Sequence, residues 1–147
     1  MTLQNWLLNG WLTPHKTSPE EISNLLSLVS RDLSDCQLPG LSPDWRLNIA
    51  YNAALQAATV ALTASGYRAA RETHHFRIIQ SLALTIGSPA ILVAQFDQFR
   101  KKRNLGGYER AGVASDQEAR EMFYLAKKIR TDVEAWLHQN HPELTGK

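Results

Sequence analysis

The stretch that decides the fold is SPDWRLNIAYNAALQAATVALTASG, residues 42–66. Ser42 can cap the start of a helix, Pro43 suits the first helical position, and Gly66 can end the helix in the left-handed conformation. Between these signals, small apolar residues recur at helical spacing. They are Ala50, Ala54, Ala57, Ala58 and Ala61, together with Leu47 and Leu62. Because alanine side chains let a neighbouring helix approach closely, we expect this helix to be central.

Residues 18–36 carry the next set of helical signals. Ser18 can cap, Pro19 fits the first turn, and Glu21 can complete a capping box. An apolar stripe follows at helical spacing. It comprises Ile22, Leu25, Leu26, Val29, Leu33 and Cys36. One face of this helix should therefore pack on the core.

The remaining segments are also helical. A helix opens within ETHHFRIIQSLALTI, residues 72–86, and another opens at Ser88 and Pro89. The last helix begins after Ser115 or Asp116 and ends before Pro142. We see no strand alternation. The sequence predicts an all-α, up-and-down bundle of four to five helices in a single domain, residues 1–147, with a short helix at residues 2–12 appended.

Composition excludes several classes of protein. The chain has 147 residues, 44% of them hydrophobic, and a net charge of +2, so a nucleic-acid role must rest on a local basic cluster. No apolar run approaches the length of a membrane span, and the N-terminus does not resemble a signal peptide. Cys36 is the single cysteine and is expected to be a buried structural thiol. We predict a cytoplasmic protein that contacts no membrane.

The densest charge lies in FRKKRNLGGYERAG, residues 99–112. Cations in the last turn of a helix interact favourably with its dipole, and Asp97 can pair with Arg100 or Lys101. This structural interpretation makes the run a helix end. The alternative is a phosphate site, because an arginine fork matches phosphate geometry and Arg103 stands where the helix meets a long loop.

The sequence predicts no metal or cofactor site. His74 and His75 are adjacent, so on a helix they point about 100° apart and cannot face one metal together. We interpret them as helix-surface or cap-region residues. There is no P-loop and no dinucleotide fingerprint. The tryptophans are expected in the core or at an oligomer interface. They are Trp6, Trp11, Trp45 and Trp136.

Three stretches together resemble the HEPN domain family. They are DWRLNIAYNAALQAATVALTASGYR, THHFRIIQSL and FRKKRNLGGY, and the likeness covers residues 42–138. The resemblance implies a helical bundle that is commonly a dimer. Many such domains act beside a minimal nucleotidyltransferase in a bacterial toxin–antitoxin pair. Active members are metal-independent endoribonucleases with a motif of an arginine, a polar residue, a short spacer and a histidine.

Arg103 and Asn104 match the first half of that motif, but Tyr108 stands where the family has histidine. RNA cleavage without a metal needs a base for the 2′-hydroxyl and a cation for the phosphate. Arg103 can supply the cation. With an ordinary pKa of about 10, only about one tyrosine in a thousand is ionised near pH 7, although Arg103 and Arg110 would lower that pKa.

The resemblance leaves two functional hypotheses and a structural one. In the first, Arg103, Asn104 and Tyr108 are catalytic in a toxin-type ribonuclease dimer. The RNA backbone would then be held by Arg100, Lys101, Lys102 and Arg110. In the second, the domain is a non-catalytic adaptor that binds nucleotide or a nucleotidyltransferase partner. In the third, the basic run is only a helix cap.

Overall fold

The structure is a computed structural model that describes residues 1–71, 74–105 and 114–146, with only the backbone of Asn104 and Leu105. The helices are α1 (Leu3–Leu8), α2 (Pro19–Asp35), α3 (Pro43–Ala64), α4 (His74–Thr85), α5 (Ala90–Leu105), α6 (Asp116–Asn140) and a 3₁₀ helix (Pro142–Thr145). Two strands, β1 (Leu12–Pro14) and β2 (Tyr67–Ala69), pair antiparallel. Helices make up most of the described chain, so the predicted all-α class is confirmed.

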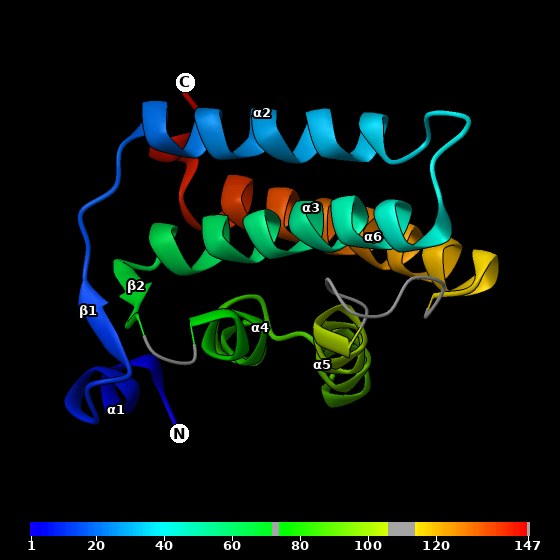
Figure 1. The fold of residues 1–147 in the computed structure, drawn as a ribbon. Helices are drawn as coiled ribbons and strands as arrows, with labels where there is room; N and C mark the ends of the chain where they lie inside the picture. Colours follow the sequence, from blue (N-terminus) through cyan, green and yellow to red (C-terminus); the bar gives the residue numbers. More distant parts are fainter. Residues whose placement is uncertain (72–73, 106–113, 147) are drawn as a thin grey trace.

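Helix α3 lies at the centre and contacts α2, α4, α5 and α6 (Figure 1). In Figure 1, α2 lies above α3 and α6, while α4 and α5 lie beneath and are viewed almost along their axes. Helix α2 runs antiparallel to α3, whereas α6 runs in the same direction as α3. The helices therefore depart from the predicted up-and-down order, because α4 and α5 cross the other three.

The burial of α3 explains its central place. Ser42 caps it by accepting a hydrogen bond from the Trp45 backbone N–H at 3.2 Å, and Gly66 follows it with a φ of +98°. The alanines of the predicted stripe are fully buried, as a helix packed on several sides requires. Even so, no helix in the described part of the chain is both long enough and apolar enough to cross a bilayer.

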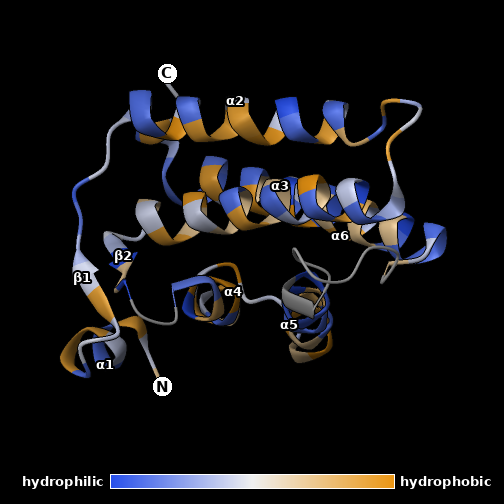
Figure 2. Ribbon diagram, in the orientation of Figure 1, coloured by the Kyte–Doolittle hydropathy of each residue, from blue (hydrophilic) through white to orange (hydrophobic). Residues whose placement is uncertain are grey.

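Helix α2 covers one side of α3 with the predicted apolar stripe. Ile22, Val29 and Leu33 are buried, and Figure 2 shows hydrophobic and hydrophilic turns alternating along the helix. Cys36 follows directly and is also buried, as predicted. Burial raises the pKa of its thiol to about 11, so the thiol stays protonated and unreactive near neutral pH.

The start of α2 differs from prediction in one detail. Ser18 Oγ accepts the Glu21 backbone N–H at 3.1 Å, as a helix cap should. The Glu21 carboxylate does not complete a capping box. It accepts the Thr17 hydroxyl at 2.6 Å and lies 2.8 Å from His15 Nε2. The Glu21 carboxylate therefore pairs with a nearby hydroxyl and imidazole instead of the Ser18 backbone N–H that a capping box would use.

The N-terminal arm is the main departure from the predicted secondary structure. The expected helix at residues 2–12 is only α1, because Gly10 adopts a left-handed φ of +79° and turns the chain. Leu12 then begins β1 and pairs with Ala69 of β2. The sequence did not predict this sheet. Each strand has only three residues, too few for a period of two to be recognised.

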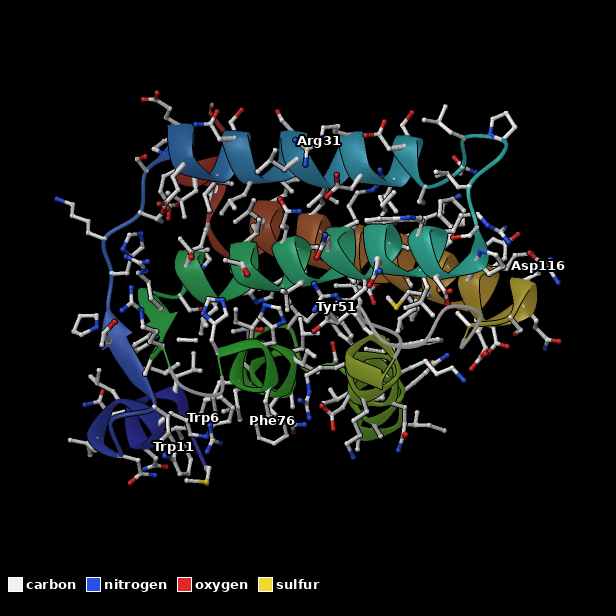
Figure 3. The ribbon with its side chains drawn as sticks, in the orientation of Figure 1. Trp6, Trp11, Arg31, Tyr51, Phe76 and Asp116 are labelled. Atoms are coloured by element: carbon white, nitrogen blue, oxygen red, sulfur yellow. The ribbon has the colours of Figure 1, made fainter. Side chains whose placement is uncertain are left out.

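A stack of aromatic rings holds this arm on the bundle. The Arg77 guanidinium of α4 lies 3.6 Å from the centroid of the Trp11 ring and 5.4 Å from that of Trp6. The two tryptophans meet edge to face, and Figure 3 shows Phe76 beside them. The arm therefore packs on its own bundle. Arginine over tryptophan combines cation–π attraction with apolar contact.

Replacing Arg77 with alanine should weaken this attachment. We expect a loss of about 0.5–2 kcal/mol in the free energy of unfolding, because a partly desolvated cation–π stack is removed. Urea unfolding followed by tryptophan fluorescence measures it. Arg71→Ala, at an exposed arginine six residues earlier in the chain, is the matched control and should change the free energy by less than about 0.5 kcal/mol. Equal losses in both variants would contradict the stacking interpretation.

Candidate functional site

The basic run lies in the last turns of α5, and three of its four cations are paired. Arg100 Nε lies 2.7 Å from a carboxylate oxygen of Asp97, and Lys101 Nζ lies 3.7 Å from the other. These are the two pairs that the sequence predicted. Lys102 Nζ reaches Glu118 of α6 at 3.0 Å. A purely structural helix end explains these three residues.

Arg103 is different. Within residues 1–71, 74–105 and 114–146 it has no carboxylate partner, and its buried Nε makes no hydrogen bond. Its guanidinium carbon lies 5.1 Å from the centroid of the Tyr51 ring. A buried N–H without an acceptor costs free energy, which an anionic ligand could recover. Helix capping requires none of these features.

Tyr51 joins Arg103 to a histidine from another helix. The Tyr51 hydroxyl lies 3.2 Å from His75 Nδ1, near the start of α4. Tyr51 itself is fully buried on α3, where its ring meets Phe96 of α5 edge to face at 5.6 Å. Figure 3 shows Tyr51 extending from α3 toward α4 and α5. We call Arg103, His75 and Tyr51 the Arg–His–Tyr cluster.

The electrostatics of this cluster favour an anion. Burial lowers the pKa of His75, and His74, Arg103 and Arg100 lower it further. Burial raises the pKa of Tyr51 to about 12, although the two arginines oppose the rise. Near neutral pH the imidazole and the phenol are therefore both uncharged. The guanidinium of Arg103 then supplies a positive charge that no described carboxylate pairs with.

The lowered pKa of His75 predicts a pH dependence of stability. A folded-state pKa below the unfolded value of about 6.5 means that the unfolded chain binds more protons. The contribution of the buried, uncharged His75 to the free energy of unfolding is present above about pH 6.5. It is lost as the pH falls toward and through the folded-state pKa. We expect the melting temperature of the wild type to fall more steeply below about pH 6.5 than that of His75→Gln. His74→Gln removes only one of the causes that lower this pKa, so its slope should lie between those of the wild type and His75→Gln. Parallel curves for all three proteins would contradict the prediction.

The structure describes only part of the predicted site. Arg100, Lys101, Lys102 and Arg103 lie together at the end of α5, and Asn104 lies in its last turn, with no side chain described. Tyr108 and Arg110 lie outside the described residues. The catalytic and binding roles assigned to all of these residues stay predictions.

The sequence did not indicate the other two members of the cluster. His74 is exposed, as a surface histidine should be, but its neighbour His75 is only partly exposed and contacts Tyr51. Tyr51 is 24 residues away in the chain and sits within the alanine-rich run. The sequence offered two signals: a tyrosine within an alanine-rich helix, and two adjacent histidines. Neither reveals a contact between two helices.

Comparisons with known proteins add no relative. No family model, no curated protein and no solved structure matches this chain. Membership of the HEPN family therefore stays a prediction from resemblance.

Proposed function

We propose that this chain is a metal-independent endoribonuclease of the HEPN type, in which Arg103 stabilises charge on the scissile phosphate. The observation that carries the proposal is the state of Arg103 within the basic run. Its buried Nε is unsatisfied in the described part of the chain, as are those of Arg46 and Arg77, but Arg103 also lies against Tyr51 at the end of α5, beside three other cations. A guanidinium fork donates two parallel hydrogen bonds to phosphate oxygens and stays charged at every physiological pH. A phosphate would provide the missing acceptor.

The neighbouring cations suit a weaker role. The Lys101 side chain is 57% exposed and that of Lys102 is 31% exposed, so both can reach an RNA backbone. Arg100 is paired more closely, with Asp97. Phosphate contacts of this kind position a nucleic acid without reading its bases. We propose that these three residues and Arg110 hold the backbone while Arg103 acts on the cleaved phosphate.

The remaining features of the proposal come from the resemblance. Asn104 would hold Arg103 or a phosphate, and Tyr108 would orient the 2′-hydroxyl or donate a proton. A homodimer would place two such sites around one cleft. The protein would then be a toxin whose antitoxin is a minimal nucleotidyltransferase.

One observation favours a second function. Tyr108 replaces the motif histidine, and no histidine lies between Arg103 and Ser115. A domain without its catalytic base could bind nucleotide or a nucleotidyltransferase partner and cleave nothing. Both functions predict a nucleotidyltransferase partner, so co-purification does not separate them. Cleavage does.

The experiment is RNA cleavage by the purified protein in excess chelator, with tRNA and a structured messenger as substrates. We expect the wild type to cut at least one of them. Tyr108→Phe, assayed beside it, reports whether the tyrosine hydroxyl takes part. A well-folded wild type that cuts neither RNA would contradict the ribonuclease proposal and favour the adaptor.

A further inference from the structure

On the basis of the proposed ribonuclease function, we infer that His75 is the general base that removes the proton from the 2′-hydroxyl. The loop after Arg103 offers no histidine for this step, whereas the fold brings one from α4. His75 and Arg103 lie against the same tyrosine ring, His75 at 5.9 Å between ring centroids and Arg103 at 5.1 Å. A base and a phosphate-binding cation therefore flank one buried residue.

The contact with Tyr51 orients the imidazole. Tyr51 is held by burial and by the edge of Phe96, so its hydroxyl is a fixed point 3.2 Å from His75 Nδ1. In the tautomer that serves a base, Nδ1–H donates to the tyrosine oxygen and Nε2 keeps its lone pair. Within the part of the chain that the structure describes, Nε2 has no hydrogen-bond partner. It is the nitrogen left for a substrate.

Burial, together with the charges around His75, keeps the imidazole neutral until it reacts. From α4 it faces His74, from α5 Arg100 and Arg103, and from α3 the uncharged phenol of Tyr51. Asp97, a carboxylate that acts on the neighbouring Tyr51, is paired with Arg100. A neutral imidazole near pH 7 can accept a proton, and the arginines that keep it neutral also attract the phosphate.

The step balances without any further reagent. His75 Nε2 takes the proton of the ribose O2′, and the freed electron pair forms the O2′–P bond. The P–O5′ bond breaks, and its electrons leave on O5′, which takes a proton from water. Protonated His75 then gives its proton to the hydroxide that remains, which restores the neutral base. Arg103 neutralises the charge that accumulates on the non-bridging oxygens. The products are a 2′,3′-cyclic phosphate and a 5′-hydroxyl end.

His74 provides the matched control, because it is the same residue type one position away and is exposed. The substrate is a DNA oligonucleotide with one ribonucleotide, cleaved in chelator. We expect His75→Gln to lower kcat by about 10²–10⁴-fold, the usual contribution of a general base, with KM within about twofold of wild type. His74→Gln should stay within about threefold in both constants. The acid limb of the wild-type pH–rate profile should lie below the ordinary histidine pKa of about 6.5 and be lost in His75→Gln.

A substrate with sulfur in place of O5′ separates base from acid. Its thiolate leaves without a proton, so it restores the rate of an enzyme that has lost its acid but not of one that has lost its base. We expect His75→Gln to remain slow on this substrate. Recovery to the wild-type rate would overturn the assignment of His75 as the base.

Tyr51→Phe covers the case in which His75→Gln does not fold. It removes only the hydroxyl that orients His75, so kcat should fall by about tenfold and the acid limb should shift. A structural role alone would leave that limb in place.

If the wild type cleaves and His75→Gln matches His74→Gln while Arg103→Ala is inactive, the inference fails and the ribonuclease function stands. If the wild type cuts nothing, both fail.

Discussion

Replacing Arg103 with alanine is expected to reduce the rate of RNA cleavage by about 10²–10³-fold, a loss of about 3–4 kcal/mol of transition-state stabilisation. The guanidinium would meet charge that develops on the phosphate, so the effect should fall mainly on kcat. Stability should change little, because the variant removes both a buried Nε that no described group satisfies and the favourable contact of the guanidinium with the Tyr51 ring. Single-turnover kinetics and a thermal melt of the same preparation measure both quantities.

Lys101→Ala is the matched control for this variant. It removes a cation from the same turn, but one that is more than half exposed and faces Asp97. We expect it to raise KM by a few fold with kcat nearly unchanged, as for a contact that only positions the RNA. If Arg103→Ala left binding and cleavage intact and lowered only the melting temperature, the basic run would be a helix cap.

Replacing Phe96 with alanine should cost about 3–5 kcal/mol of unfolding free energy, the usual range for a buried phenylalanine. Phe96 is fully buried and meets Tyr51 edge to face, so the variant leaves a cavity behind the tyrosine of the Arg–His–Tyr cluster. Part of a typical domain's stability of about 5–15 kcal/mol would be lost, and the variant should still fold at low temperature. Urea unfolding followed by circular dichroism measures the difference.

Phe96→Leu tests whether the cost comes from the cavity. Leucine fills much of the space without an aromatic edge, so the loss should be smaller, about 1–2 kcal/mol. Both variants should loosen Tyr51 and lower cleavage. A cost below about 1 kcal/mol for Phe96→Ala would show that the packing of α5 on α3 is not as described.

Local chemistry explains what the sequence could predict. The caps at Ser18, Ser42 and Ser115 act within three residues of their partners, and each helix begins where its cap indicates. The buried alanine face of α3 and the pairs of Asp97 depend on spacing along one helix. These features involve residues that are close together in the chain, so spacing alone predicts them.

Contacts between elements explain what it could not. The β1–β2 pair joins residues more than fifty positions apart, and each strand is too short to show a period. The Tyr51–His75 contact depends on how α4 crosses α3, which periodicity does not determine. Arg103 could be named as a candidate from its charge and its place in the basic run. That its Nε has no hydrogen-bond partner in the described chain became visible only in the fold.

The most direct test of the central claim is the chemistry of the ends that the protein leaves on RNA. A DNA oligonucleotide with a single ribonucleotide is incubated with wild-type protein in excess chelator, and the fragments are identified by mass spectrometry. The predicted result is one cut after the ribose, with a 2′,3′-cyclic phosphate on one fragment and a 5′-hydroxyl on the other. No cut, or a cut that leaves a 3′-hydroxyl and a 5′-phosphate, would contradict attack of the 2′-hydroxyl on a phosphate that Arg103 stabilises.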